Sequence, residues 1–435
     1  MPQRFEVRDP IHGFVPFSEW ERDVINHPVF QRLRRIWQLA WTDWVYPGAM
    51  HTRFEHSLGV MHTATLMFDQ IRGHSADLLR DLGFSGAGIE KDRQTVRLAA
   101  LLHDVGHAPF SHAGEDLMPT DETTGKLFKH EAYSAALIRT LMTDVIDGHR
   151  LNDLGIRAAD IAELIEGGPL SQRKLFWRQI VTSQLDADRA DYLLRDSYHL
   201  GVHYGRYDLI RIITSLTAVQ NREIDAPVLA IDEGGWHAAE SLLWARYQMF
   251  TQVYLHKTRV AYDLHIAGAM AELLRSQQAN DGLREPERFP PPTDAANLGL
   301  YLRWTDWRSL ALIEQGAAGD HGARLLERRH HRMVYATPEV TEMLDQRHLD
   351  QALEALAHLA PVVRSAKSSW YKPDLEIVVA RDAAPPHNLI RLSRLSAAVR
   401  GLTPSNKQML YVPCEQAAEA RRIVQSIPFE QEVQP

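Results

Sequence analysis

A chain of 435 residues is long enough to bury one large core. Its formal net charge of −8 gives no general attraction to nucleic acid. Cys414 is the single cysteine, which excludes an internal disulfide and a thiolate metal cage, so a metal would need nitrogen and oxygen ligands. No run of about 18 apolar residues occurs, and the N-terminus lacks the features of a signal peptide. We therefore expect a cytoplasmic protein that does not bind membranes.

The first 275 residues are expected to be mainly α-helical, because apolar residues recur there every three or four positions and β-branched runs are few. A pattern from about 240 to 275 predicts one bent helix or two. The clearest of the other helical segments are residues 29–40, 56–71, 93–105, 131–146 and 186–200.

The composition changes after the helical segment that ends near residue 275. Residues 276–298 are rich in proline and polar residues, which predicts a surface connection. Residues 299–365 return to a helical pattern, so we expect a helical extension. Residues 366–435 contain the short apolar runs LEIVVA and QMLYVPC and a helical pattern after Cys414, which predict a small α+β C-terminal region.

The segment LAALLHDVGHAPFSH contains the strongest chemical signal. An apolar helix leads into His103 and Asp104, and Gly106 and Pro109 then end it. A lone buried His–Asp pair is about as often a hydrogen-bonded core pair as a metal site. A metal site would need further ligands from elsewhere in the chain.

Two other segments offer such ligands. PGAMHTRFEHSLGV places His56 at the start of a helical pattern. LDADRADYLLRDSYHLG sets Asp188, Tyr192 and Asp196 at four-residue spacing, which puts them on one face of a helix. A solvated acidic face is the alternative interpretation, but such a face seldom has a tyrosine in its middle and two leucines beside it.

Together these phrases resemble the deoxynucleoside triphosphate (dNTP) triphosphohydrolases of the HD-domain superfamily, which include an animal enzyme with a sterile-alpha-motif domain. RDPIHGF, FQRLRRIWQL and KHEAYS belong to the same resemblance. It covers about residues 5–275 and implies a helical HD-domain core over residues 1–275, with no sterile-alpha-motif domain before it. The order of the phrases is more specific than any one of them.

The resemblance implies one divalent metal ion per active site. Two imidazoles and two carboxylates suit Mn, Fe, Zn, Ni or Mg and do not distinguish among them, and Mg could also accompany the substrate triphosphate. The implied metal ligands are His56, His103, Asp104 and Asp188.

The implied reaction cleaves a dNTP at its α-phosphorus to deoxynucleoside and inorganic triphosphate, in nucleotide-pool control. The leaving 5′-oxygen needs a proton, which an imidazole can donate near neutral pH. We expect His112 and His130 to be the catalytic pair and His107 to contact phosphate, while Glu115 orients His112 where the family often has aspartate. Any of these histidines taken singly is as often structural.

Substrate contacts also follow from the resemblance. A continuous helix would place Arg246, Tyr254 and Lys257 on one side, which favours their joint use. Arg189 stands where the animal enzyme has lysine. The implied phosphate contacts are Arg53, Arg189, Arg246 and Lys257. The implied sugar contacts are Gln38, Leu39, Tyr192, Asp196 and Tyr254, with a tyrosine that leaves little room for a 2′-hydroxyl.

A regulatory nucleotide site is implied at Gln31 and Arg34, with two departures from the family. The animal enzyme reads guanine with an aspartate where this chain has Asn26, and Arg8 replaces an asparagine. We expect a nucleotide effector of different base selection and no strict need for GTP or dGTP. Family members are tetramers or hexamers, so a homo-oligomer is expected.

Two alternatives remain open from the sequence. The same metal centre could serve a nuclease, a phosphodiesterase or a hydrolase of another nucleotide, and the products would differ. A catalytically silent nucleotide-binding scaffold is the second alternative, against which the intact set of ligands and histidines argues. The sequence does not identify the preferred base or the native metal.

Overall fold

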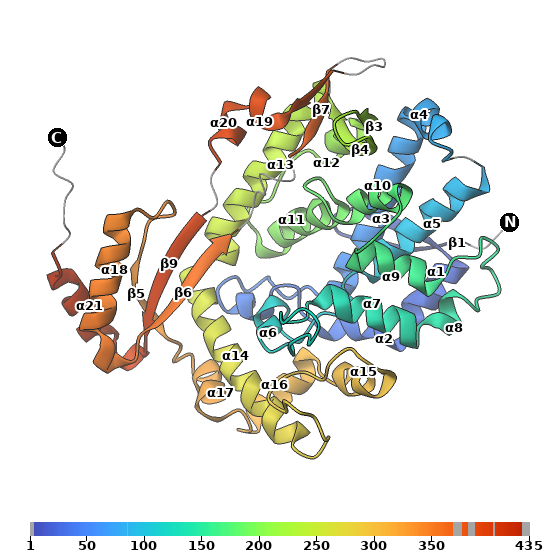
Figure 1. Ribbon diagram of the computed structural model, residues 1–435. Coiled ribbons are helices and arrows are strands. Elements are labelled where there is room, and N and C mark those ends of the chain that lie inside the picture. The colour runs from blue at the N-terminus through green and yellow to red at the C-terminus, as the bar shows by residue number, and fades with distance from the viewer. Residues whose placement is uncertain (1–3, 85, 369–375, 382–387, 403–404, 429–435) are drawn as a thin grey trace.

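The computed structural model describes residues 4–428 except 85, 369–375, 382–387 and 403–404, and it is mainly α-helical around one large core, as predicted (Figure 1). Among the described residues, no helix is both long and apolar enough to span a bilayer. The principal helices are α3 (Arg53–His74), α5 (Ala87–Leu102), α7 (His130–Leu141), α9 (Ala158–Glu166), α10 (Gln172–Val181), α11 (Ala187–Leu200), α13 (Trp236–Met249) and α14 (Lys257–Gln278).

Helix α3 packs against α5 and α11, and local signals fix where these helices begin. Thr52 and Glu55 form a capping box at the start of α3, and the Asp186 side chain accepts a hydrogen bond from the Arg189 backbone N–H at the start of α11. Gly201, with φ of 69°, ends α11. The helix ends that carry the site residues are therefore set by the sequence nearby.

The prediction of one helix over residues 29–40 is wrong. The chain forms a short helix α2 (Pro28–Gln31) and a 3₁₀ turn η1 (Arg32–Arg35), is extended at Ile36 and Trp37, and turns at Gln38 and Leu39 before η2 (Ala40–Trp44). Trp37 pairs with Thr52 in an isolated bridge, and the Gln38 N–H donates to the His51 carbonyl. These tertiary hydrogen bonds replace helical ones.

One other helical prediction needs a smaller correction: the segment 131–146 breaks at Met142 into α7 and α8 (Thr143–Ile146). The segment 240–275 is two helices separated by a π-helical turn at Phe250–Tyr254, which is one of the two forms predicted. The predominantly helical first part also contains two antiparallel hairpins and short helices. These are β1 (Arg4–Asp9) with β2 (Gly13–Ser18), β3 (Leu216–Asn221) with β4 (Ala226–Asp232), α1 (Glu19–Asn26), α4 (Ala76–Asp81), α6 (His112–Glu115) and α12 (Leu209–Thr214).

The helical extension after the connection is only partly helical. Its helices are α15 (Ala295–Leu302), α16 (Asp306–Glu314) and α17 (Gly319–Leu326), and α17 packs against α14. Strand β5 (Arg332–Ala336) and helix α18 (Met343–Ala355) also fall within this range. They belong to the α+β structure that the sequence suggested only from residue 366.

The C-terminal strands divide between two sheets. Strand β9 (Ser405–Val412) lies between β5 and β6 (Val362–Ser368) in an antiparallel sheet. Helices α18 and α21 (Ala417–Ser426) share a small hydrophobic core with this sheet. By contrast, β7 (Val378–Ala380) adds in parallel to β4, and β8 (Leu389–Arg391) pairs with β7. The runs QMLYVPC and LEIVVA therefore contribute to strands β9 and β7 of different sheets, and Leu375 of the second run lies outside the described residues (Figure 1).

Candidate metal centre and active site

The four residues expected to bind metal come together from three helices. His56 lies in the first turn of α3, His103 directly follows α5, Asp104 is next in the chain, and Asp188 lies in the first turn of α11. Because α3 packs against both α5 and α11, residues up to 132 positions apart meet at one point. The four residues, although far apart in the sequence, therefore form one cluster in the fold.

The distances within this cluster suit a shared cation. The His56 Nε2 atom lies 3.1 Å from Asp188 Oδ1 and 3.7 Å from Asp104 Oδ2. His103 Nε2 lies 3.1 Å from Asp104 Oδ1 and 3.7 Å from Asp188 Oδ1. His56 is fully buried whereas the Asp188 side chain is 35% exposed, so the cluster is open on the α11 side.

The ring orientations leave the inner nitrogens available. The Nδ1–H of His103 donates to the Ala100 carbonyl at 2.8 Å, and the Nδ1–H of His56 donates to Asp191 Oδ2 at 2.8 Å. Each Nε2 atom therefore faces the carboxylates, and the buried His103 Nε2 has no hydrogen-bond partner among the described residues. An orphaned imidazole nitrogen and a second imidazole nitrogen that faces a carboxylate fit the ligand set of a divalent metal.

A buried network that the sequence analysis missed supports His56. Asp191 also accepts from His12 Nε2 at 2.6 Å and from the Arg195 guanidinium at 2.7 and 2.8 Å. A Cβ on Gly59 would lie 1.9 Å from Asp191 Oδ1, so only glycine allows this approach. Such outer partners fix the orientation of a metal-binding imidazole.

The N-terminal phrase RDPIHGF supplies the other end of this network. Asp9 Oδ1 accepts the N–H groups of Ile11 and His12 at 2.8 and 2.9 Å, and its Oδ2 accepts from Arg195 at 2.9 Å. The phrase itself, and the four-residue spacing of Asp191 and Arg195, were the signals that could have revealed it.

The electrostatics favour a positive charge at the centre. Burial opposes protonation of His56, but hydrogen bonds and charge from Asp188 and Asp191 prevail and raise its pKa to about 10. Burial disfavours the Asp104 carboxylate, yet Arg53, which donates to it, and His103 hold its pKa well below the usual range. The carboxylates of this pocket thus favour a positive charge beside them.

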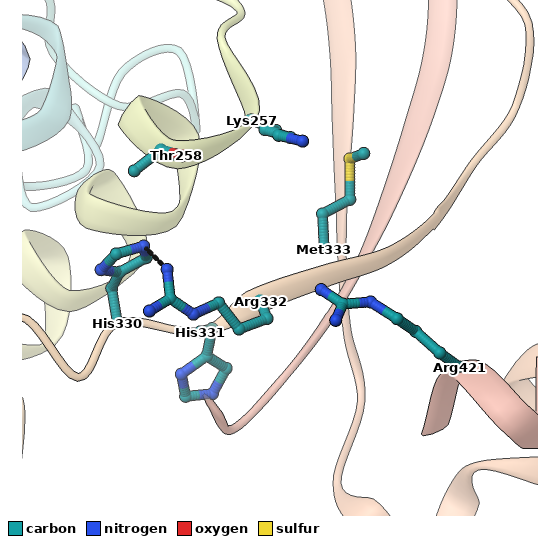
Figure 2. A pocket seen from close by; sticks show the side chains of 7 residues that line it. All are labelled: Lys257, Thr258, His330, His331, Arg332, Met333 and Arg421. Atoms are coloured by element: carbon teal, nitrogen blue, oxygen red, sulfur yellow. Dashed lines mark hydrogen bonds between the residues drawn. The ribbon is translucent and has the colours of Figure 1, made fainter. Parts of the chain in front are cut away.

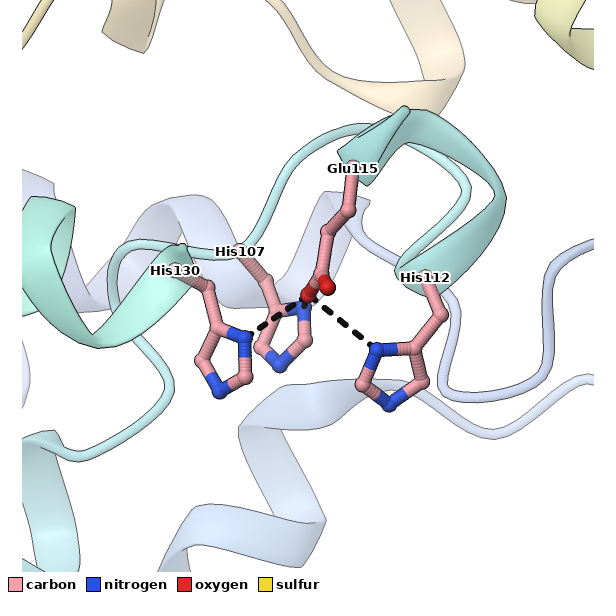
Figure 3. A group of neighbouring side chains, drawn as sticks. All are labelled: His107, His112, Glu115 and His130. Carbon is pink, nitrogen blue, oxygen red and sulfur yellow. Dashed lines mark hydrogen bonds and ion pairs between the residues drawn. The ribbon is translucent and has the colours of Figure 1, made fainter. Parts of the chain in front are cut away.

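A second cluster lies beside the first, and Figure 3 shows its arrangement. Glu115 Oε1 lies 2.7 Å from His130 Nδ1, 3.1 Å from His112 Nδ1 and 3.5 Å from His107 Nδ1. The other nitrogen of each ring points away from the carboxylate, to the same side in this view. His107 Nε2 lies 3.3 Å from Asp104 Oδ1, so this side faces the first cluster.

The stacked rings of His107 and His130, with centroids 3.8 Å apart, have pKa values displaced in opposite directions. Burial opposes the charge of His130, but Glu115 outweighs it and raises the pKa to about 9. Burial, Arg53 and His130 hold the pKa of His107 well below its usual range. At neutral pH His130 is therefore a proton donor and His107 is neutral.

The expected sugar contacts form a connected group. Tyr254 Oη donates to Asp196 Oδ2 at 2.6 Å, and His51 Nε2 donates to Asp196 Oδ1 at 2.8 Å. The His51 carbonyl accepts the Gln38 N–H at 3.0 Å, and the rings of Tyr192 and Tyr254 meet edge to face with centroids 6.2 Å apart. Leu39 is buried beside Gln38 in the chain.

Three of the four expected phosphate contacts lie around this group and the metal cluster. Arg53 donates to Asp104 and to Ser111 Oγ, the latter at 3.0 Å. Arg246 is buried and interacts with Tyr192. Arg189 is on α11 next to Asp188, but its side chain turns back to Asp186 and would have to rotate to reach a phosphate.

Lys257 does not join them, which corrects the expectation of a single helical face. The π-helical turn and a break at His256 separate it from Arg246, and it is exposed at the start of α14. It lines a pocket of about 250 Å³ beside the C-terminal sheet, where Figure 2 shows it near Met333 and Arg421. No recorded contact of the described residues links Lys257 to the metal cluster.

The expected regulatory residues lie at the surface near α2. Arg34 Nε donates to Gln31 Oε1 at 2.8 Å, and its guanidinium covers the Phe54 ring at 3.5 Å. Asn26 is exposed at the end of α1. A nucleotide site here stays a prediction.

Comparison with known families matches two regions of the chain. Residues 53–196 match the HD domain, and residues 207–290 match the HD associated region. The metal cluster and the histidine cluster both lie within the first region.

Relatives with curated names resemble the same part of the chain. An uncharacterized protein of Methanocaldococcus jannaschii is 35% identical over 271 residues, 62% of this chain and 50% of that protein. The protein named deoxynucleoside triphosphate triphosphohydrolase SAMHD1 homolog in Dictyostelium discoideum is 32% identical over 288 residues, 65% of this chain and 52% of that protein. This chain thus spans about half the length of these relatives.

Solved structures match over nearly the whole chain. A hypothetical protein from Aquifex aeolicus has a TM-score of 0.76 and 26% identity, covering 97% of this chain and 100% of that one. A phosphohydrolase from Bacteroides thetaiotaomicron has a TM-score of 0.69 and 25% identity, covering 94% and 100%. The similarity therefore extends to the C-terminal region.

Proposed function

Since an HD domain and an HD-associated region make up its core, this chain belongs to the HD-domain phosphohydrolases, and we propose that it is a metal-dependent dNTP triphosphohydrolase. It would cleave a dNTP to deoxynucleoside and inorganic triphosphate, in control of the nucleotide pool. The name of the Dictyostelium relative supports this choice of substrate within the broader family.

One observation carries the proposal: the metal cluster and the group expected to bind the sugar share one face of α11. Asp188, Tyr192 and Asp196 lie one helical turn apart, and the last two meet Tyr254. Arg246 interacts with Tyr192 between them. A substrate with phosphates at one end and a sugar at the other suits this order.

The metal, which His56, His103, Asp104 and Asp188 would bind, supplies Lewis acidity and lowers the pKa of bound water. The side chains around it then have separate tasks. Arg53 and Arg246 offset the phosphate charges.

Hydrolysis adds water to the α-phosphorus and breaks its bond to the 5′-oxygen. The leaving oxygen takes one proton, which the charged His130 and its neighbour His112 are placed to donate. Glu115 holds both rings by Nδ1, which leaves Nε2 for the transfer. The products are a neutral deoxynucleoside and triphosphate.

The tyrosines beside Asp196 are expected to select deoxyribose. A 2′-hydroxyl would have to fit against the Tyr192 and Tyr254 rings, whose edge-to-face packing leaves little space. We predict that dGTP is hydrolysed at least about tenfold faster than GTP, since one tightly packed group excludes an added hydroxyl by a steric clash. Equal rates in a coupled phosphate assay would rule out this gate.

The test is to load the protein with Mn²⁺ and to incubate it with each dNTP. Deoxynucleoside and triphosphate, separated by anion-exchange chromatography, are the expected products. Deoxynucleoside monophosphate with pyrophosphate, or degradation of oligonucleotides alone, would contradict the proposal and favour a phosphodiesterase or nuclease. Absence of turnover with Mn²⁺, Fe²⁺, Zn²⁺, Ni²⁺ and Mg²⁺ would contradict it as well.

A further inference from the structure

The turn that leads to His112 has an unfavourable backbone conformation. Phe110 and Ser111 have φ of 59° and 56°, a region that side chains with a Cβ rarely adopt. Strained residues of this kind persist where surrounding contacts hold them, and they concentrate at functional sites. The turn therefore needs partners outside itself.

Its main partner is Asp306, the first residue of α16. The Asp306 carboxylate is fully buried, and its Oδ1 accepts the Phe110 N–H at 2.8 Å. Burial raises the pKa of Asp306 to about 7, although the backbone N–H bonds and nearby arginines act against this rise. A buried carboxylate with two backbone donors is a costly group, which indicates a specific role.

The second Asp306 oxygen reaches the other side of the site. Oδ2 accepts a hydrogen bond from the N–H of Trp37, the residue directly before Gln38, at 2.7 Å. The Trp37 carbonyl in turn accepts a hydrogen bond from the Ser111 hydroxyl at 2.6 Å. One carboxylate thus links the turn before His112 with the segment that carries Gln38. It accounts for the unexpected end of the helix in residues 29–40.

The residues just before Asp306 contact the same loop. Tyr301 Oη donates to the Gly106 carbonyl at 2.7 Å. The Trp304 carbonyl accepts from the buried Arg32 guanidinium at 2.8 Å, which also donates to the His107 carbonyl at 2.8 Å. The segment 301–306 therefore contacts the histidine loop at several backbone groups.

We propose that Asp306, which lies beyond both family regions, is a positioning residue that fixes the turn before His112 and the segment before Gln38 in their working relation. The inference rests on the proposed function for its kinetic consequence only. Its geometric consequence is that His112 and Gln38 keep their places through Asp306, whereas the hydrogen bonds of its carboxylate go to Trp37 and Phe110 and not to a metal ligand.

The test compares Asp306→Asn with Asp294→Asn in the metal-loaded full-length protein. Asparagine can accept only one of the two N–H bonds, whereas Asp294 is an exposed cap at the start of α15 that bonds to Asn297. For Asp306→Asn, kcat for a dNTP should fall about 10- to 100-fold with KM within about threefold, because misplaced acid groups slow chemistry more than binding. Metal content should remain that of the wild type, and Asp294→Asn should match the wild type throughout.

An independent readout is the imidazole NMR signal of His112 in the Zn²⁺-loaded protein, assigned with His112→Gln. This signal should shift in Asp306→Asn while those of His56 and His103 stay in place. If Asp306→Asn does not fold, Tyr301→Phe removes one bond to the loop and should lower kcat about threefold, in proportion to a single neutral hydrogen bond.

An unshifted His112 signal together with near-normal kcat would overturn the proposal. Loss of kcat only in proportion to lost metal or folded protein would overturn it too, since that result describes a structural role. If the wild type hydrolyses no dNTP, the proposed function fails, and the His112 signal alone decides on Asp306.

Discussion

Two groups of side chains among the described residues have the composition of a metal site, and their internal geometry differs. In the first, His56 and His103 bond outward through Nδ1, so their Nε2 atoms face the space shared with two carboxylates. In the second, the Nδ1 atoms of the histidines converge on Glu115, whose carboxylate oxygen occupies the centre. Similar residue types thus suit cation binding in one place and proton transfer in the other.

The largest effect is expected from a substitution that breaks the first cluster. Asp104→Asn removes a charge that both imidazoles face, and it should abolish stable metal binding and lower kcat/KM at least about a thousandfold, since a catalytic metal supplies several kcal/mol. Metal analysis and steady-state kinetics measure this. Asp77→Asn on the exposed surface of α4 is the control, and a variant that keeps both metal and activity would contradict the assignment.

Glu115→Gln tests the second cluster. The amide is neutral, so it bonds His112 and His130 more weakly and no longer stabilises their charged forms, and kcat should fall about 100-fold while metal content is retained. Loss of metal in this variant would mean that the second cluster binds it.

The pH dependence sharpens this test. Because Glu115 raises the pKa of His130 from 6.5 to about 9, the charged pair contributes stability that is fully present below pH 6.5, and His130 stays a proton donor up to about pH 9; both are lost as the pH rises through about 9. The alkaline limb of kcat should therefore lie near pH 9 in the wild type and move to lower pH in Glu115→Gln. Identical limbs would show that this carboxylate does not control the donor.

A third change weakens the support of the first cluster without touching a ligand. Asp191→Asn should lower metal affinity about 10- to 100-fold, because the outer partner of His56 loses its charge. The matched control is Glu21→Gln, which breaks the equally buried pair with Arg97; among the described residues, neither member of this pair hydrogen-bonds to a metal ligand. Calorimetric titration should show unchanged metal affinity in the control even where its melting temperature falls. Equal affinities in both variants would make the Asp191 network purely structural.

The smallest effect concerns a residue that belongs to neither cluster. Lys257→Ala should leave kcat/KM of the unactivated enzyme within about twofold, because the side chain lines a different pocket, whereas Arg246→Ala should lower it about tenfold through a lost charge near the phosphates. Measuring kcat/KM of the two variants side by side tests this difference. A larger loss in Lys257→Ala would restore the expectation that it contacts substrate.

The sequence predicted most of the helical core and brought the ligand residues to attention, because helix caps and apolar periodicity are local signals. Helix α11, with its cap at Asp186 and its end at Gly201, illustrates this. The extended segment around Trp37 could not be predicted, since it depends on Asp306 from 269 positions away. The early hairpins and strand β5 escaped for a similar reason: their pairing partners lie elsewhere in the chain or in short runs with weak alternation.

For the site as well, features with a local signal in the sequence were predicted and features that depend on tertiary contacts were not. Residue identities at His56, His103, Asp104 and Asp188 came from specific phrases, and the structure brings these side chains together. The expectation of one helical face from Arg246 to Lys257 was wrong, because it extended the face across a break that only the π-helical turn reveals. The four-residue spacing of Asp191 and Arg195 was a local signal of their pairing, but the contacts of Asp191 with His12 and His56 join distant segments and have no signature in the sequence.

Anomalous diffraction from crystals of the Mn²⁺- or Zn²⁺-loaded protein tests the central claim most directly. The account predicts one strong peak within bonding distance of His56 Nε2, His103 Nε2, Asp104 and Asp188, with Glu115 still bonded to its histidines. A peak among His107, His112, Glu115 and His130, with none at the first cluster, would contradict it.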